Sequence, residues 1–276
     1  MTYTKILLFG STGMLGRYIY TYFYKLSTYQ IINIEYRVNN ENLNLLEQLL
    51  IENNIDDKTC IINCIGLIPQ RKSSDIPEKN YYIINGLFPQ LLWSICRKYN
   101  AKMIQPTTDC VFSGKKGKYI ETDFHDETNN YGISKSLGEP NDCTVIRTSI
   151  IGKEILNKKS FLEWVISNKN NKINGWTNHL WNGITCLEYC KVIEKIIQHN
   201  LFWSGVRHIC SPTSKSKYEL AMYISNCFNL NIEICPVTSN EIVDKTLSSL
   251  YGNNINKFNI PELFLQINEL KHIDLL

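Results

Sequence analysis

The sequence has no large excess of either charge and no long apolar segment. Its 276 residues include 29 lysines and arginines against 26 aspartates and glutamates, a formal net charge of +3. A balance this even argues against nucleic acid or an anionic membrane surface as a partner. The first apolar run, residues 6–9, ends at Gly10 and is too short for a secretion signal or a membrane span. We therefore expect a cytoplasmic protein with neither nucleic acid nor a membrane as partner.

The sequence also lacks a linker rich in proline, glycine or serine, and it has no internal repeat. Cysteine is plentiful: ten occur, mostly within apolar runs, which is typical of reduced thiols in a cytosol-like compartment rather than of a disulfide framework. Two pairs have three residues between them, Cys60 with Cys64 and Cys186 with Cys190. Neither pair is matched by a Cys/His pair at finger spacing, so we predict no metal site.

Strand-like apolar runs alternate with helical patterns through the first half of the chain. The runs predict strands at residues 5–9, 31–36, 60–65, 102–112 and 143–149. The patterns between them predict helices at residues 14–26, 43–53, 81–98 and 131–139. Strands this continuously apolar are buried on both faces, as in a parallel sheet covered by crossover helices. We predict an α/β fold with a doubly wound parallel sheet of the Rossmann type.

The rhythm loosens after residue 150. We expect helices at residues 160–168, 187–199 and 215–229 and strands at 206–209 and 232–237. These elements predict a smaller C-terminal substrate lobe, intertwined with the first domain because no linker separates them. We therefore divide the chain into a dinucleotide-binding domain, residues 1–150, and a substrate lobe, residues 151–276, with part of 180–210 returning to the first domain.

A glycine loop follows the first predicted strand and precedes the first predicted helix. Its three glycines, Gly10, Gly13 and Gly16, have the spacing G-x-x-G-x-x-G. They allow a tight turn, a close approach of the backbone to a pyrophosphate, and close packing of helix on strand. The helix N-terminus then favours the negative charge. We predict a dinucleotide site whose loop residues are Gly10, Ser11, Thr12, Gly13, Met14, Leu15 and Gly16.

The end of the second predicted strand decides between the two nicotinamide cofactors, because the adenosine ribose lies there. Glu35 could accept hydrogen bonds from a 2′-hydroxyl, whereas Arg37 could pair with a 2′-phosphate and Arg17 could assist it. If the Glu35 carboxylate points away from the ribose, the two arginines favour binding of a 2′-phosphate. We expect NADPH, with NADH as the alternative.

Tyr131 and Lys135 form the most informative pair in the sequence. Residues four apart share a helix face, so we expect the Lys135 ammonium to lower the pKa of the Tyr131 phenol and to hold the nicotinamide ribose. Tyr131 is then the general acid. A hydroxyl at a strand's carboxyl end would bind the substrate carbonyl. We expect Thr108 in that role, with Thr107 as its neighbouring alternative.

The motifs occur together in one known family: Gly10-x-x-Gly13-x-x-Gly16, Asn63-Cys64-Ile65-Gly66, Ile84-Asn85-Gly86, Thr108-Asp109-Cys110-Val111-Phe112, Tyr131-x-x-x-Lys135-x-x-Gly138-Glu139 and Arg147-Thr148-Ser149. They resemble the extended short-chain dehydrogenase/reductase family and, within it, the dTDP-4-dehydrorhamnose reductase branch. The resemblance covers roughly residues 5–210, and its specific motifs precede residue 150.

This resemblance implies a function and further site residues. The cofactor is expected along the glycine loop and against Cys64, Ile65 and Gly66, and the protein is expected to form a homodimer. The substrate is a nucleotide-linked 4-keto-6-deoxyhexose held by the smaller lobe. The residues expected to contact it are Asn85, Thr108, Asp109, Trp181 and Asn182.

Cys110 departs from the reductases of this branch, which commonly have tyrosine there. GDP-fucose synthase and the bifunctional UDP-rhamnose synthases resemble the chain at this position, and they both epimerise and reduce. A 4-keto group acidifies the hydrogens at C3 and C5, so an acid and a base can invert both carbons. Strand alternation would turn Cys110 toward the cleft with Thr108. The resemblance offers His179 or Lys172 as its acid/base partner.

We therefore expect NADPH-dependent 4-keto reduction with 3,5-epimerisation, which would convert UDP-4-keto-6-deoxyglucose into UDP-L-rhamnose. We expect UDP as the nucleotide of the substrate because Cys110 resembles the residue in the UDP-rhamnose synthases, and dTDP and GDP remain alternatives. One alternative is a 4-reductase alone. Another is a non-catalytic, cofactor-binding regulatory subunit of a different enzyme.

Overall fold

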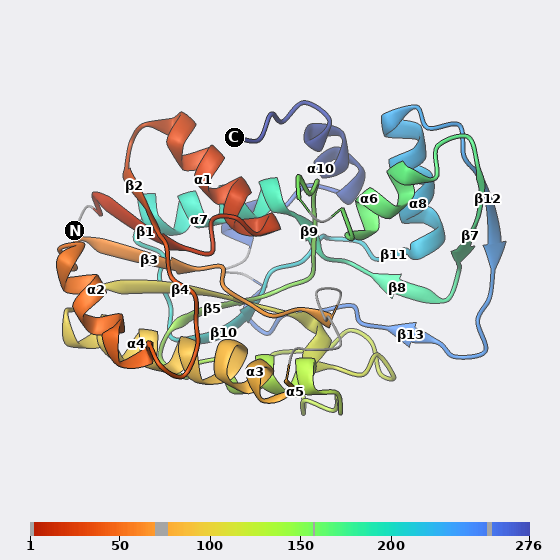
Figure 1. Ribbon diagram of the computed structural model, residues 1–276. Coiled ribbons are helices and arrows are strands. Elements are labelled where there is room, and N and C mark those ends of the chain that lie inside the picture. Colours follow the sequence, from red (N-terminus) through yellow and green to blue (C-terminus); the bar gives the residue numbers. More distant parts are fainter. Residues whose placement is uncertain (1–2, 70–76, 157, 253–255) are drawn as a thin grey trace.

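A six-stranded parallel sheet forms the centre of the protein. The computed structural model describes residues 3–69, 77–156, 158–252 and 256–276. The strand order is β10-β5-β4-β3-β1-β2, and the predicted α/β fold with a parallel sheet is confirmed (Figure 1). In that order the strands are β10 (Gly205–His208), β5 (Thr144–Arg147), β4 (Lys102–Thr107), β3 (Thr59–Asn63), β1 (Lys5–Phe9) and β2 (Gln30–Ile34).

Helices cover both faces of this sheet (Figure 1). Ile6 and Leu8 of β1 pack in a core with α1 (Met14–Leu26) and α7 (Cys186–Gln198). Leu7 and Phe9 point to the opposite core, which contains residues of α2 (Leu46–Glu52) and α4 (Phe88–Lys98). Alternate residues of one strand are thus buried on opposite faces, as the continuously apolar strands predict.

The helical segment predicted at residues 81–98 is not uniform. It consists of α3 (Lys79–Tyr81), the π-helical turn η3 (Tyr82–Leu87) and α4. The wide turn contains Asn85, which is 1% exposed. Its side-chain amide donates to the carbonyl of Leu67 and accepts from the Leu67 amide. A buried side chain here replaces backbone pairing for the loop after β3.

The predicted strand 102–112 is wrong in its second half. β4 ends at Thr107, and a 3₁₀ turn, η4 (Asp109–Val111), follows. The cause is local: the Thr108 Oγ1 accepts a hydrogen bond from the Cys110 amide over 3.1 Å, which turns the chain out of the strand. Strand alternation therefore does not relate Thr108 and Cys110.

The remaining elements build the smaller part and its links to the sheet. They include α5 (Asn130–Leu137), which follows the η4 loop, the 3₁₀ turn η1 (Leu43–Leu45) before α2, and η5 (Asn256–Phe258). The smaller part contains β6 (Ile150–Ile151), α6 (Phe161–Ser167), β7 (Lys172–Trp176), β8 (His179–Trp181), β9 (Ile184–Thr185), β11 (Lys215–Ser216), α8 (Lys217–Phe228), β12 (Glu233–Val237), β13 (Val243–Asp244) and α10 (Leu263–Leu270). β10 lies beside β5 in the central sheet. The domain boundary at residue 150 remains a proposal. None of the helices in the described ranges is long and apolar enough to cross a membrane.

Candidate functional site

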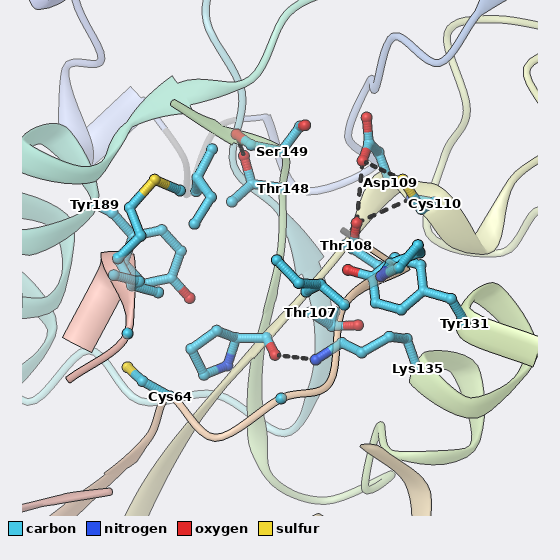
Figure 2. A pocket seen from close by; sticks show the side chains of 18 of the residues that line it. Cys64, Thr107, Thr108, Asp109, Cys110, Tyr131, Lys135, Thr148, Ser149 and Tyr189 are labelled. Carbon is cyan, nitrogen blue, oxygen red and sulfur yellow. Dashed lines mark hydrogen bonds between the residues drawn. The ribbon is translucent and has the colours of Figure 1, made fainter. Parts of the chain in front are cut away.

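A cavity of about 440 Å³ opens at the carboxyl ends of β1, β3, β4 and β5. Loops from these four strands meet there with α5 and with the segment after β13 (Figure 2). Its lining includes Gly13, Met14, Leu15, Cys64, Ile65, Gly66, Thr107, Thr108, Asp109, Cys110, Tyr131, Lys135, Tyr189 and Lys245. The cavity is at the edge of the sheet where open α/β folds bind ligands.

The glycine loop has a shape that only glycine permits at two positions. Gly10 has φ +76°, and a Cβ there would lie 2.7 Å from the Cys64 carbonyl carbon. A Cβ on Gly16 would lie 2.1 Å from the Gly10 oxygen. Gly13 begins α1 without a side-chain cap, and the first turn contains no acidic residue. The free amides at this helix start can bind a phosphate, so the loop fits a dinucleotide.

The residues expected to distinguish the two nicotinamide cofactors lie at the surface. Glu35 and Arg37 are exposed and follow β2. The Arg37 carbonyl accepts a hydrogen bond from Asn42 over 2.6 Å. The Arg17 guanidinium donates to the Leu276 carbonyl over 2.5 Å. The preference for NADPH over NADH stays a prediction.

Tyr131, Thr108 and Lys135 gather on one side of the cavity, across from Cys64 and Tyr189 (Figure 2). Helix α5 brings Tyr131 there. Burial raises the pKa of the Tyr131 phenol, the nearby Cys110 raises it further, and hydrogen bonding with Thr108 opposes the rise. Tyr131 therefore keeps its proton at neutral pH, as a general acid must.

Lys135 does not act on Tyr131 as expected. Its Nζ donates to the Pro106 carbonyl over 3.2 Å (Figure 2), and burial lowers the pKa of Lys135 to about 8. The prediction that Lys135 lowers the pKa of the phenol is wrong in this structure, because burial dominates and the pKa of Tyr131 is raised. The ammonium remains in the same cavity, where it can bind an oxygen-rich ligand.

Asp109, which is buried, and Cys110, which is half-buried, lie beside Thr108 (Figure 2). The Asp109 carboxylate, in a residue 3% exposed, accepts hydrogen bonds from the Thr108 hydroxyl over 3.1 Å and the Cys110 thiol over 3.5 Å. Burial raises the pKa of Asp109, and Lys245 and Lys217 oppose the rise. Burial and Asp109 raise the pKa of the Cys110 thiol to about 12. Cys110 is thus a protonated thiol at neutral pH.

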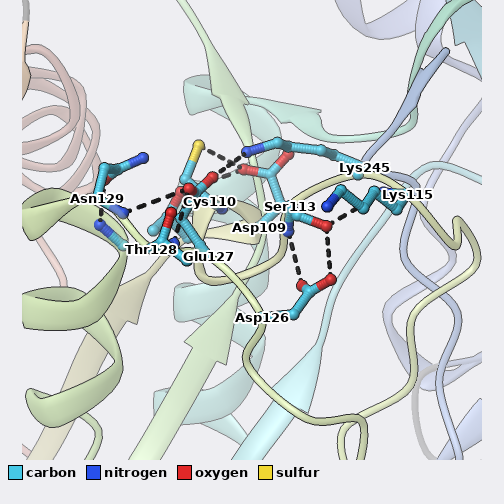
Figure 3. Close-up of polar contacts among 12 residues, drawn as sticks. Asp109, Cys110, Ser113, Lys115, Asp126, Glu127, Thr128, Asn129 and Lys245 are labelled. Atoms are coloured by element: carbon cyan, nitrogen blue, oxygen red, sulfur yellow. Dashed lines mark hydrogen bonds and ion pairs between the residues drawn. The ribbon is translucent and has the colours of Figure 1, made fainter. Parts of the chain in front are cut away.

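Lys245 is a cavity residue that the sequence analysis missed. Its Nζ lies 3.3 Å from the Glu127 Oε2 (Figure 3). The segment before it is held in place because the Asp244 amide donates to the Gly114 carbonyl over 2.7 Å. Cys110, Asp109 and Glu127 raise the pKa of Lys245 against the opposite effect of burial. Lys245 and Glu127 are 118 positions apart, so no local pattern could predict the pair.

The two residues expected to exchange protons with Cys110 lie outside this cavity, and that role stays a prediction. Lys172 is exposed and pairs with Glu233 over 2.6 Å, on the neighbouring strand. His179 stacks on Trp176 with ring centroids 5.3 Å apart and hydrogen-bonds Ser239 over 2.8 Å. Neither lines the cavity that contains Cys110, because β7 and β8 belong to the smaller part of the fold.

Three of the expected substrate ligands make structural contacts outside this cavity, and their role in substrate binding stays a prediction. The Asn85 amide donates to the Ser134 hydroxyl over 3.1 Å and so joins η3 to α5. Trp181 is 5% exposed in the core. The Asn182 side chain hydrogen-bonds both backbone groups of Leu247, each over 2.8 Å, and thereby fixes the segment after β13. None of the three lines the cavity.

The parallel sheet and its glycine loop place the protein among Rossmann-like α/β proteins. Residues 4–251 match the model of the RmlD substrate binding domain family, and the chain belongs to that family. A curated relative, dTDP-4-keto-6-deoxy-D-glucose reductase of Streptomyces niveus, is 24% identical over 77% of this chain and 74% of its own. Methionine adenosyltransferase 2 subunit beta of Xenopus laevis is 25% identical over 86% and 76%.

A solved structure gives the same fold. The dTDP-4-dehydrorhamnose reductase of Bacillus anthracis, in complex with NADP, superposes with a TM-score of 0.79. The two sequences are 21% identical, and the match covers 97% of this chain and 98% of that one. At this identity the likeness concerns the fold.

Proposed function

We propose that the protein is an NADPH-dependent reductase of the 4-keto group in a nucleotide-linked 6-deoxyhexose. The observation that carries the proposal is one cavity that contains a general acid, a hydroxyl donor, a buried lysine and the glycine loop. The reductase named in Streptomyces niveus and the NADP complex from Bacillus anthracis support the reaction and the cofactor.

The residues present fit a nicotinamide dinucleotide. The uncapped start of α1 is free for its phosphates. The hydroxyls of Thr107 and Tyr189 are buried without a hydrogen-bond partner among the described residues, and both residues line the cavity. Buried polar atoms of this kind need a partner, and a bound amide or sugar can supply one. When bound, the cofactor supplies the hydride for C4.

The chain's own residues then manage the oxygen on C4. Tyr131 donates its phenolic proton to that oxygen as negative charge develops. Thr108 donates a second hydrogen bond once its hydroxyl turns from Asp109 to the substrate, and the pair stabilises the oxyanion. The Lys135 ammonium adds positive charge beside Tyr131 and can hold a ribose hydroxyl.

The test is NADPH oxidation with UDP- and dTDP-linked 4-keto-6-deoxyglucose. Tyr131→Phe removes the acid while it keeps the ring, and we expect a loss of at least a hundredfold in kcat, the usual worth of general acid catalysis. Tyr81→Phe is the matched control, because Tyr81 lies with its ring 6.5 Å from that of Tyr131 and does not line the cavity. Equal rates for the two variants would contradict the proposal.

Epimerisation at C3 and C5 of a UDP-linked substrate is the finer hypothesis. The location of Cys110 in the same cavity supports it, and the raised pKa of the thiol suits a proton donor rather than a base. Turnover in heavy water followed by NMR tests it. Deuterium at C3 and C5 of UDP-rhamnose supports epimerisation, whereas a product without solvent deuterium leaves a 4-reductase alone.

A regulatory subunit is the second candidate function, since a similar relative is named as subunit beta of methionine adenosyltransferase 2. Such a subunit would bind NADPH without turning over any 4-keto sugar. NADPH binding by fluorescence, measured beside the turnover assay, separates the two functions.

A homodimer is proposed from the family resemblance, and light scattering after size exclusion tests it.

A further inference from the structure

Lys245 reaches the cavity from the segment after β13, in the smaller part of the fold. Its side chain passes close to the loop after η4, because a Cβ added to Gly114 would lie 3.1 Å from the Lys245 Cγ. The backbone before it is held by the bond from the Asp244 amide to that loop. The backbone after it is held because the Thr246 carbonyl accepts from the Tyr119 amide over 2.9 Å. The Lys245 ammonium is therefore anchored to the cavity on both sides.

Acidic groups surround this ammonium (Figure 3). The Lys245 Nζ lies 3.3 Å from the Glu127 Oε2, and the two side chains are only 20% and 16% exposed. Asp109 and Cys110 line the cavity together with Lys245. Burial lowers the pKa of Lys245, but Cys110, Asp109 and Glu127, in that order, raise it above its usual value. Charge interactions decay with distance, so the ammonium lies near the Cys110 sulfur.

The Cys110 sulfur needs a cation if the thiol is to give up its proton. When a thiol donates to a substrate carbon, the S–H bond breaks, the sulfur keeps the electron pair, and a thiolate remains until water returns a proton. Here the thiolate would lie 3.5 Å from the Asp109 carboxylate oxygen. Burial and Asp109 both raise the pKa of the thiol, and Lys245 lowers it. Lys245 thus opposes the two effects that keep the sulfur protonated.

We propose that Lys245 is the ionic partner of Cys110, whose thiolate its ammonium stabilises when Cys110 acts as an acid. Lys245 is then a positioning residue for that step, and the Glu127 carboxylate competes for the same ammonium. Two other titratable groups face this cluster. The Lys217 ammonium interacts with the charges of Asp109 and Cys110, and the Tyr131 phenol keeps its proton at neutral pH. The inference rests on the proposed function only in the role that it gives to Cys110.

The test measures the reactivity of Cys110 itself. Iodoacetamide reacts with thiolates, and mass spectrometry of the peptide that contains Cys110 separates it from the other cysteines. Loss of a nearby opposite charge should raise the pKa of the thiol by about 1 unit or more. Thiolates of higher pKa are more nucleophilic, which offsets part of the lost population. At pH 8.5 we therefore expect Lys245→Met to slow alkylation of Cys110 roughly threefold or more. Lys245→Arg keeps the charge and should react at nearly the unaltered rate.

Glu127→Gln should change the rate in the opposite direction. It removes the carboxylate that competes for the Lys245 ammonium, and it keeps an oxygen that can accept from the Thr128 amide, as the Glu127 Oε1 does over 2.9 Å. We expect Cys110 to react faster in this variant. A general disturbance of the cavity would shift Lys245→Met and Glu127→Gln in the same direction. Lys115→Met is the matched control, because Lys115 is exposed on the loop after η4, and its rate should be unchanged.

Three results would overturn the inference: equal rates for Lys245→Met and the unaltered protein, slower alkylation in Glu127→Gln, or equal slowing in Lys115→Met. If Lys245→Met does not fold, Glu127→Gln decides alone, and an unchanged rate there counts against the inference. The assay needs neither cofactor nor substrate. A protein that passes it but reduces no sugar therefore refutes only the proposed function, whereas C4 reduction beside a failed assay refutes only the role of Lys245.

Discussion

Lys135→Met should make the protein more stable while it abolishes activity. Burial lowers the pKa of Lys135 to about 8 from its usual 10.5. At about 1.4 kcal/mol per pKa unit, the buried ammonium costs up to about 3.4 kcal/mol of folding free energy. Partial exposure reduces this cost, and the variant also loses the hydrogen bond to Pro106, which contributes about 1 kcal/mol. We therefore expect a net gain of about 1–2 kcal/mol at pH 7.

The pH dependence makes this prediction specific. Above pH 8 the folded protein releases the Lys135 proton, whereas the unfolded chain holds it until about pH 10.5. The unfolded state then binds more protons, so the unaltered protein gains stability as pH rises from 8 to 10.5. Methionine does not titrate, and the advantage of Lys135→Met should shrink over the same range.

Urea unfolding at pH 7, 8.5 and 10 measures both effects. Lys79→Met is the control, because Lys79 is exposed at the start of α3 and should change stability by less than about 0.5 kcal/mol. A Lys135→Met protein that is less stable than the unaltered one at pH 7, by an amount independent of pH, would refute the reasoning.

Three further predictions concern the glycine loop and a buried ionic cluster. Gly16→Ala should lower the free energy of unfolding by about 1–3 kcal/mol and weaken NADPH binding, because its Cβ would lie 2.1 Å from a backbone oxygen. Gly13→Ala is the control and should stay folded, because its Cβ would lie 3.5 Å from the nearest such atom. Equal urea midpoints for the two variants would contradict this prediction. Glu139→Gln should lower the free energy of unfolding by about 3–5 kcal/mol, because it leaves Arg147, which is 1% exposed, without its carboxylate partner. A loss below about 1 kcal/mol in urea unfolding would contradict this prediction. Burial and Arg147 lower the pKa of the His208 imidazole from 6.5 to about 4. As the pH falls from 6.5 to 4, the unfolded chain therefore binds this proton before the folded protein does, and the free energy of unfolding should fall more steeply than in His208→Gln. Parallel profiles of stability against pH for the two proteins would contradict this prediction.

The fold could be predicted well because its signals are local. The helix expected at residues 14–26 coincides with α1 (Met14–Leu26), since the glycine loop and the apolar periodicity mark its start and its buried face. The continuous apolar runs gave the parallel sheet for the same reason. The strand predicted at residues 102–112 was too long, because the Thr108 hydroxyl accepts a hydrogen bond from the Cys110 amide and β4 ends there.

The candidate site was predictable only where its residues are fixed by strand ends. Thr108, Tyr131 and the glycine loop share a cavity because parallel strands end at one edge. Lys245 and Lys217 reach their places through contacts between distant segments, which no spacing encodes. The sequence also could not predict that the pKa of Tyr131 is raised, because this shift depends on burial rather than on the lysine four residues away.

The most direct measurement of the central claim follows the hydrogen itself. The protein is incubated with NADPH deuterated at the transferable position and with UDP- or dTDP-linked 4-keto-6-deoxyglucose, and the product is analysed by NMR. We expect one deuterium at C4 of the reduced sugar, and we expect Tyr131→Phe to lose it. Unreduced sugar in the presence of bound NADPH, or C4 deuteration that survives in Tyr131→Phe at the full rate, would contradict it.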